Sequence, residues 1–551
     1  MAQSIARGAA LLALLVLAAY FPAFSAGFVW DDGVYITGNE TLRSWSGLAD
    51  IWFRPGATRE YYPLVFTTFW VEHQLFGAKP WIYHATNVIG HAGSACILWR
   101  ICCALRLPGA WLAAAVFALH PVHVESVAWA VERKNVLSCA FALIATHQWL
   151  RFLDHRRRWH VSMAAVAFTA AMLSKPAVAP LPVVLLLVAW WRAGRVERAV
   201  TVASIPMFAV ALALGALHYF LEQGNLASTL LVVDAQPVEQ ALAAGRAAWF
   251  YAGKLLFPYP LVTHYARWDV MSAPVVHGAV LAATIALPIV LWSLRDRIGR
   301  GPFVAVASYL ALLAPASGLV SFAYLRFAQV ADHLQYVPSI ALTTGFVAVV
   351  ARHRPPSARR WIATIVLAVL GLLTHRQARL YESNARLFEH NVRHEPAAWG
   401  AHDQLGGEAL KVRDFAAAER HYASSLRMLP TNDVALANLG IALAGLGRDA
   451  EARDAFARAL ERQPHQHALR VNLATVLERQ GDLSGAAAEY ELVLSRDARS
   501  IAALNNLALL RERAGRLDEA LELLRRAESI RPGVPAIEEN LRRIQSARTP
   551  R

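Results

Sequence analysis

Residues 431–464, TNDVALANLGIALAGLGRDAEARDAFARALERQP, form a 34-residue unit that recurs near the end of the chain. The same spacing runs through the segments 397–430, 431–464, 465–498 and 499–532. A leucine (Leu405, Leu439, Leu473, Leu507), a small residue (Ala418, Ala452, Ala486, Ala520) and a large residue (Tyr422, Phe456, Tyr490, Leu524) recur in register. The alanine lets two antiparallel helices approach, and the large residue fills the gap between them. The pattern therefore predicts an α-solenoid of helical hairpins.

This unit resembles the tetratricopeptide repeat. Pro430, Pro464 and Pro532 end three units, whereas Ala498 ends the third. The segment 533–548 is expected to form a capping helix. Such arrays offer a groove to extended peptides, so the resemblance implies a protein partner and no chemistry. A spacer or assembly module is the alternative.

The part of the chain before the repeats has the composition of a membrane protein. Of the 551 residues 56% are hydrophobic and only 17% are charged, which is far from the balance of a soluble domain. Apolar windows of nearly membrane-spanning length recur from residue 8 to residue 375 and then stop. We therefore predict two domains, a membrane helix bundle at 1–380 and a repeat domain at 381–551, which makes the chain all-α.

Short basic runs give the bundle an orientation. They lie between apolar segments at 154–158, 192–198, 295–300 and 352–360, which is typical of cytoplasmic loops and not of a nucleic-acid surface. The N-terminus is then inside and residues 28–80 form a large outer loop. Eleven crossings are predicted, near 8–27, 84–105, 109–122, 136–153, 159–173, 176–192, 199–221, 275–295, 302–322, 335–351 and 361–376.

Two apolar segments have a second interpretation. Residues 241–259 are interpreted as re-entrant or interfacial, because a full crossing there would place the 295–300 run outside. The first segment also has the pattern of a cleavable signal peptide. With eleven crossings, the repeat domain lies on the same outer side as the loop 28–80.

Ionisable residues in the membrane half cost free energy and need a reason. They gather in three groups on the predicted outer side, where Lys175 also lies: Asp31, Asp32, His84 and His91; His120, His123, Glu125, Glu132, Arg133 and Lys134; and Arg326, Asp332, His333 and Tyr336. A carboxylate near cations at a membrane face suits transfer of a group from a lipid phosphate to a hydroxyl. The carboxylate is the general base, and Arg133, Lys134, Lys175 and Arg326 are candidates to stabilise the phosphate that leaves. Taken singly, each cation has the alternative role of anchoring a helix end.

Five motifs carry a resemblance to a known family. They are WDD (30–32), YHATNVIGH (83–91), HPVHVESVAWAVERKNVLS (120–138), SKPAVAPLP (174–182) and ADHLQYVPS (331–339), followed by the repeats. Together they resemble the transmembrane and tetratricopeptide repeat protein family. The resemblance implies a glycosyltransferase of the GT-C superfamily that moves mannose from a polyprenyl-phosphate donor to a protein hydroxyl. It also implies that Asp31 is the catalytic carboxylate. Asp32 is then expected either to assist Asp31 or to bind a metal.

Some features depart from that family or stay open. His333 stands where related sequences carry arginine, so the charge there depends on pH, and Arg326 is expected to compensate. The remaining group members, His84, His91, His120, His123, Glu125, Asp332, His333 and Tyr336, are expected to line the substrate pocket. HPVHVE has metal-like spacing but lacks a third ligand, so no metal ligand is assigned and a divalent cofactor stays open.

The compartment and the function class each have an alternative. Only four cysteines and Ala/Arg-rich usage suit a bacterial inner membrane with periplasmic repeats; the alternative is the endoplasmic reticulum with lumenal repeats. One rival function is a scaffold that only anchors the repeats. The other is a transporter of a lipid-linked sugar, which would need charged groups deep in the spans and access from both faces.

Overall fold

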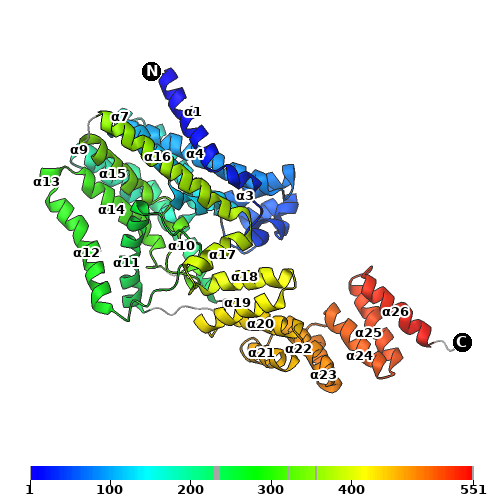
Figure 1. Ribbon diagram of the computed structural model, residues 1–551. Helices are drawn as coiled ribbons and strands as arrows, with labels where there is room; N and C mark the ends of the chain where they lie inside the picture. Colours follow the sequence, from blue (N-terminus) through cyan, green and yellow to red (C-terminus); the bar gives the residue numbers. More distant parts are fainter. Residues whose placement is uncertain (1, 228–235, 321, 354–355, 549–551) are drawn as a thin grey trace. The chain divides into compact units, whose positions relative to one another are not determined.

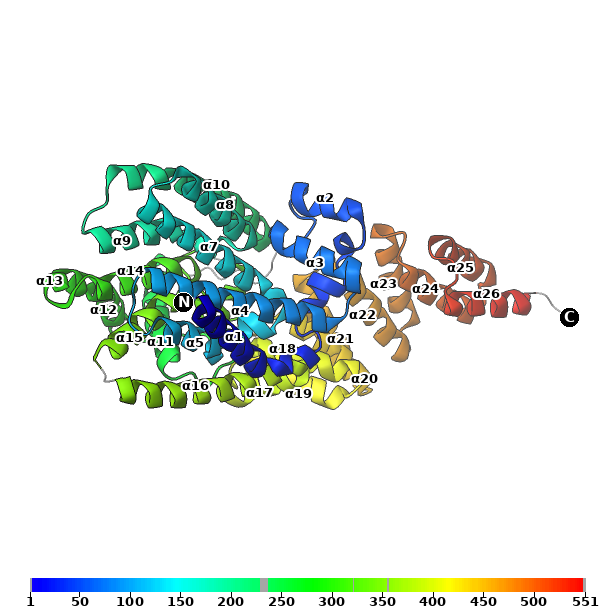
Figure 2. The same cartoon turned by 90° about the horizontal axis from the view of Figure 1, so that it is seen from above.

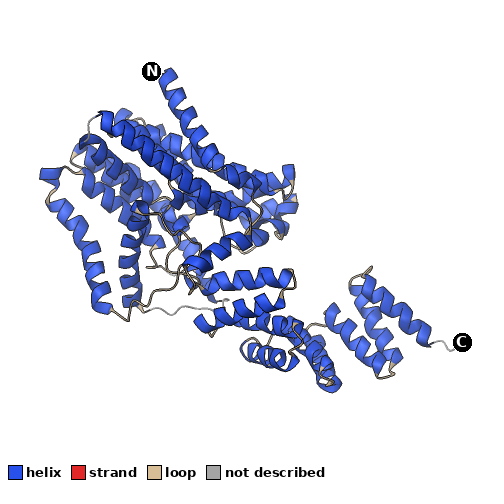
Figure 3. Ribbon diagram, viewed as in Figure 1, coloured by secondary structure: helices blue, strands red, loops and turns tan. Residues whose placement is uncertain are grey.

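A computed structural model describes residues 2–227, 236–320, 322–353 and 356–548, and the chain divides into two compact units, Met1–Ala398 and Trp399–Arg551. Within the described residues every regular element is a helix (Figure 3). The all-α prediction is confirmed. Because residues 354–355 are outside the described part, the predicted basic loop 352–360 is described only in part.

The described part of the first unit contains seventeen α-helices joined by short 3₁₀ and π turns (Figure 1). Their bounds are α1 Ala2–Ala19, α2 Trp45–Phe53, α3 Pro63–Phe76, α4 Pro80–Ala104, α5 Ala110–Leu119, α6 Val124–Ala128, α7 Arg133–His155, α8 Arg158–Ser174, α9 Leu181–Ala193, α10 Arg198–Ala227, α11 Pro237–Leu256, α12 Pro274–Ser293, α13 Arg295–Ile298, α14 Gly301–Leu313, α15 Ser339–His353, α16 Pro356–Ala378 and α17 Asn384–His394.

Helices α7 to α10 pack together as an up-and-down group (Figure 2). Their shared core contains Trp149, Phe168, Met172 and Leu185, all with no exposed surface. Small residues of α8, such as Ala171, let α7 and α8 approach closely. The turn α7–α8 and the turn α9–α10 therefore lie at one end of the group, and the starts of α7 and α9 lie at the other.

Within the described residues, five helices are long and apolar enough to cross a bilayer, which is typical of a membrane protein. They are Ala130–His155, Pro176–Ala193, Arg198–Gln223, Pro274–Ser293 and Trp361–Glu382, and the bent pair α5–α6 is a sixth if it counts as one span. This is fewer than the eleven crossings predicted. Three more predicted crossings correspond to shorter apolar helices at 5–19, 301–316 and 339–353. Helix α4 falls short in hydropathy because it buries the polar residues His84, Asn87, His91 and Ser94.

The boundary between the units lies later than residue 380. Residues 381–398 belong to the first unit because α17 is tied to its loops. Phe388 is fully buried there, and the Asn391 Oδ1 accepts hydrogen bonds from the His264 backbone N (2.7 Å) and the Thr263 hydroxyl (2.8 Å). The apolar windows end at 375, so hydropathy alone does not predict that α17 docks on the first unit.

The second unit is built of helical hairpins followed by one last helix. Their bounds are α18 Trp399–Lys411, α19 Phe415–Met428, α20 Asp433–Gly445, α21 Asp449–Arg462, α22 His467–Arg479, α23 Leu483–Arg496, α24 Ile501–Arg513, α25 Leu517–Ile530 and α26 Pro535–Arg548. The four register alanines have no exposed surface. The ring of Phe456 lies so close to Gly440 that a Cβ there would be 2.7 Å from it. The predicted hairpin packing is confirmed.

Candidate active site

The two adjacent aspartates follow a strained turn at Trp30. Trp30 has a left-handed φ of 50°, which a bulky side chain adopts only when its surroundings hold it there. Its backbone N donates to the Asn384 Oδ1 (2.7 Å), and its ring stacks on Trp129 with centroids 4.8 Å apart. The chain then enters a short π-helical turn, η2 (Gly33–Thr37). This aromatic clamp fixes where Asp31 and Asp32 point.

Asp32, which is expected to assist catalysis or bind a metal, makes contacts of a structural kind. Its side chain is fully buried, and its two oxygens accept hydrogen bonds from the backbone N of Val29 and of Val131, each 2.9 Å long. Burial raises the pKa of Asp32, and these two hydrogen bonds lower it. Asp32 thus ties the turn to the segment before α7, and both of its oxygens already accept a hydrogen bond.

Asp31 is the carboxylate that stays available. Its Oδ1 is shielded from solvent and makes no hydrogen bond within the described residues. Burial raises the pKa of Asp31 to about 7, Lys134 and Arg59 lower it, and Glu132 and Glu60 raise it. A buried oxygen without a partner costs free energy, which a ligand hydroxyl would recover.

Lys134 and Lys175 lie in one network with two acidic residues. Lys134 Nζ is 3.2 Å from Glu60 Oε2 and 3.1 Å from Glu132 Oε1. Lys175 Nζ is 3.6 Å from Glu132 Oε2 and donates to Asn135 Oδ1 (2.8 Å). The structure therefore brings two of the four predicted cations together.

Glu60 was not singled out in the sequence, whereas Glu132 belongs to the second ionisable group but was given no role. Glu132 was detectable as a carboxylate directly before the cations Arg133 and Lys134, next to an apolar span. Glu60 lies in the loop 28–80, and nothing in its sequence surroundings marks it. The two carboxylates balance the lysines, so the network is close to neutral before a substrate binds.

Arg326 contributes a second unpartnered group near Asp31. It ends the 3₁₀ turn η8 (Ala323–Arg326), and its Nε is shielded from solvent without a hydrogen-bond partner in the described residues. Burial and the nearby Arg59 lower the pKa of Arg326, whereas Tyr35 and Asp31 raise it. A buried donor and a buried acceptor, both unsatisfied, thus lie in the same electrostatic surroundings.

Arg133, which is predicted to bind the donor phosphate, contacts α3 and α4 and not the lysine network. It is fully buried, and Nη1 is 2.6 Å from Glu72 Oε2. Nε donates to Asn87 Oδ1 (2.8 Å), and Nη2 donates to the Tyr83 carbonyl (2.6 Å). Each of the three guanidinium nitrogens thus donates at least one hydrogen bond, and Arg133 joins α3, α4 and α7.

Substitution of Arg133 should therefore cost stability rather than donor affinity. We expect Arg133→Met to lower the free energy of unfolding by about 3–5 kcal/mol, because Glu72 is left as an unpaired buried charge. Thermal unfolding of the purified protein measures this. Arg133→Met combined with Glu72→Leu is the control and should recover part of the loss. An unchanged melting temperature together with weaker donor binding would return Arg133 to the site.

The predicted pocket histidines form a separate buried cluster. His91 Nδ1 is 2.6 Å from the Tyr336 hydroxyl, and His120 Nε2 is 3.0 Å from the Leu255 carbonyl. The His123 ring lies between these side chains, and its nitrogens have no partner in the described residues. His84 is 3.2 Å from the Gly27 carbonyl. These contacts are typical of packing between helices, and none of them includes Asp31.

The third predicted group, which follows α14 in the sequence, contacts the lysine network through His333. Glu125 Oε2 accepts from the His333 backbone N (2.8 Å) and lies 3.2 Å from His333 Nδ1. The Tyr265 hydroxyl donates to Asp332, whose pKa burial raises. The His333 carbonyl accepts from Asn135 (3.1 Å), which links this group to Lys175.

Room for ligands is small in the part of the network described. Asn135 and Lys175 line a cavity of about 20 Å³, which is enough for one water molecule. A hexose therefore requires side chains to move there. Among the described residues, no group of three or more His, Cys, Asp or Glu side chains is placed to hold a metal ion.

Comparisons with known proteins match parts of the chain. The tetratricopeptide repeat family matches residues 404–467 and 471–535, so the chain carries these repeats. Protein O-mannosyl-transferase TMTC2 of Mus musculus is 34% identical over 142 residues, which are 24% of this chain and 17% of that protein. Protein O-mannosyl-transferase TMTC1 of Homo sapiens is 33% identical over 162 residues, 27% of this chain and 18% of that protein. The matches thus span less than a fifth of these relatives. The crystal structure of MamA protein is 18% identical with a TM-score of 0.25, and covers 27% of this chain and 81% of that one.

Proposed function

We propose that this chain is a membrane glycosyltransferase that moves a hexose from a polyprenyl-phosphate donor to a serine or threonine hydroxyl of a protein. The observation that carries the proposal is the buried, unpaired Oδ1 of Asp31, whose pKa is about 7, in the surroundings of Lys134 and Arg326. The similarity to proteins named O-mannosyl-transferases supports mannose as the sugar. The repeats support a polypeptide acceptor.

The proposed reaction is a direct displacement at the sugar. The acceptor hydroxyl donates a hydrogen bond to Asp31 Oδ1, and its proton moves to Asp31 as the new oxygen–carbon bond forms at the anomeric carbon. The bond from that carbon to the phosphate oxygen breaks, and its electron pair stays on the polyprenyl phosphate. Arg326 donates from Nε to this phosphate, and Lys134 adds positive charge nearby.

The orientation of the site is also a proposal. Helix α7 starts beside the network with Lys134 and ends at His155, next to the basic run 154–158. Its 23 residues span about 34 Å, close to the thickness of a bilayer core. Since basic loops favour the cytoplasm, Asp31 lies on the outer side: the periplasmic face of a bacterial inner membrane, or the lumenal face of the endoplasmic reticulum.

A reconstituted assay separates this function from its rivals. The full chain in liposomes is incubated with a polyprenyl-phosphate hexose and a hydroxyl-containing peptide, and the peptide's intact mass is measured. A gain of one hexose supports the transferase. Movement of the donor across the bilayer without a mass gain indicates the transporter. If neither a mass gain nor donor movement is observed, the scaffold function is supported.

The pH dependence of transfer is expected to follow Asp31. Only the deprotonated carboxylate acts as a base, so kcat/KM should rise with pH, with a midpoint near the Asp31 pKa of about 7. Arg59 lowers this pKa, so Arg59→Gln should move the midpoint to higher pH. Arg54→Gln removes the same charge from the same loop and is the matched control, with an unchanged midpoint. A rate that stays flat between about pH 6 and pH 8 would contradict the assignment of the base.

A further inference from the structure

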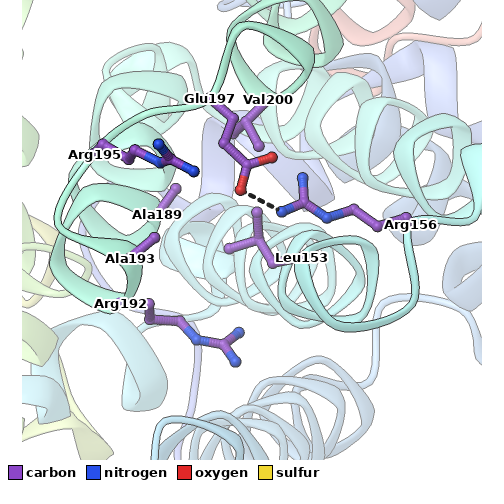
Figure 4. A pocket seen from close by; sticks show the side chains of 8 residues that line it. All are labelled: Leu153, Arg156, Ala189, Arg192, Ala193, Arg195, Glu197 and Val200. Carbon is purple, nitrogen blue, oxygen red and sulfur yellow. Dashed lines mark hydrogen bonds and ion pairs between the residues drawn. The ribbon is translucent and has the colours of Figure 1, made fainter.

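A basic cavity lies at the other end of the α7–α10 group. It has a volume of about 190 Å³ and lies where α7 and α9 end and α10 begins. Its rim carries Arg156, Arg192, Arg195 and Glu197, and its floor includes Leu153 and Val200 (Figure 4). We call these six residues the arginine pocket.

The charges of the arginine pocket are only partly balanced. Arg156 Nη2 is 2.8 Å from Glu197 Oε1, and Arg192 Nη2 is 2.6 Å from Asp154 Oδ1. The side chains of both pairs are 33–45% exposed, so these pairs contribute little and can exchange partners. Arg195 makes no ion pair or hydrogen bond with the described residues. Three guanidinium groups therefore surround a single carboxylate of the pocket.

The floor and the position of the pocket indicate what kind of anion fits. Leu153 and Val200 belong to the apolar core of the helix group, so the cavity is basic at its mouth and apolar below. It lies at the end of α7 opposite to Lys134, about a bilayer thickness from the network of Asp31. Free phosphate would use only the mouth, whereas a lipid fits both parts.

We propose that the arginine pocket binds the phosphate group of an anionic membrane lipid, in the leaflet opposite to the candidate active site. Guanidinium groups bind phosphate oxygens through paired hydrogen bonds, and basic pockets between membrane helices suit anionic head groups. The lipid would hold the ends of α7, α9 and the start of α10 together. This site is independent of the sugar transfer proposed above.

The test measures lipid binding by the full chain. Native mass spectrometry of protein from nanodiscs of phosphatidylcholine with increasing phosphatidylglycerol gives the apparent affinity for phosphatidylglycerol. Arg156→Gln with Arg195→Gln should weaken this affinity by roughly 30-fold, as expected for two charges at a membrane surface. The control, Arg157→Gln with Arg158→Gln, removes equal charge from exposed positions of the same loop outside the rim and should change little.

Two results would overturn the proposal. Equal weakening in the pocket variant and the loop control would mean that only general positive charge attracts the lipid. Displacement of phosphatidylglycerol by millimolar inorganic phosphate, without any preference over phosphatidylcholine, would assign the pocket to a soluble anion. If the double variant fails to fold in a thermal unfolding assay, Arg195→Gln alone serves, because Arg195 makes no ion pair with any described residue that could be lost. Transfer activity does not enter these readouts, so they do not depend on the proposed function.

Discussion

Asp31→Asn should reduce hexose transfer by about 100- to 10,000-fold, the range that a positioned general base contributes. The amide keeps the shape of the side chain but cannot take the acceptor proton. Asp31 Oδ1 makes no hydrogen bond within the described residues, so the substitution breaks no contact there. The measurement is the initial rate of peptide glycosylation by purified, reconstituted protein.

The same substitution should leave the fold intact, and the melting temperature is a second measurement that tests this. Burial raises the pKa of Asp31 from its ordinary value of 3.8 to about 7. Between pH 3.8 and about pH 7 the folded state therefore binds a proton that the unfolded state lacks. The stability from this proton is lost as the pH rises through about 7. At pH 8 Asp31→Asn should therefore melt no lower than the wild type.

Asp32→Asn is the matched comparison and should behave in the opposite way. Asp32 accepts from the backbone N of Val29 and of Val131, and an amide would place its NH₂ against one of these donors. We expect a lower melting temperature there. Near-normal transfer by Asp31→Asn, with the melting curve of a folded protein, would remove Asp31 from the mechanism.

What the sequence predicts well is local. The repeat period follows from contacts between neighbouring helices, and the positions it singles out, such as Ala452 and Phe456, are buried in the predicted hairpins. The Asp31 turn was also recognisable, because two carboxylates directly after an apolar run need a reason. These inferences use spacing within a few tens of residues.

What the sequence leaves open depends on distant partners. Arg133 and Lys134 are neighbours in the chain, yet one is committed to Glu72 and the other lies between Glu60 and Glu132. The partners of these two adjacent cations, Glu72 and Glu60, lie 61 and 74 residues away in the sequence. Which cation faces a substrate therefore depends on how distant helices pack. In the same way, the role of Asp32 depends on Val131, 99 residues away.

Deletion of the repeats, residues 399–551, should separate recruitment from chemistry. The repeats form a compact unit with their own buried core, which includes Phe456, Leu473 and Leu504. None of the residues proposed to act on the sugar lies in that unit. We therefore expect the truncated chain to glycosylate a short hydroxyl-containing peptide at high concentration nearly as fast as the full chain.

Transfer to a folded protein acceptor should fall far more, by about 100-fold or greater. If the repeats hold the acceptor near Asp31, they raise its effective concentration, and linked sites of this kind gain about 100- to 10,000-fold in avidity. The ratio of the two rates, protein acceptor to short peptide, is the measured quantity, and it cancels differences in the amount of active enzyme. Thermal unfolding and size-exclusion chromatography establish that the truncated chain is folded. An equal loss on both acceptors would mean that the repeats help to build the active site, since recruitment alone cannot slow the reaction of a saturating peptide.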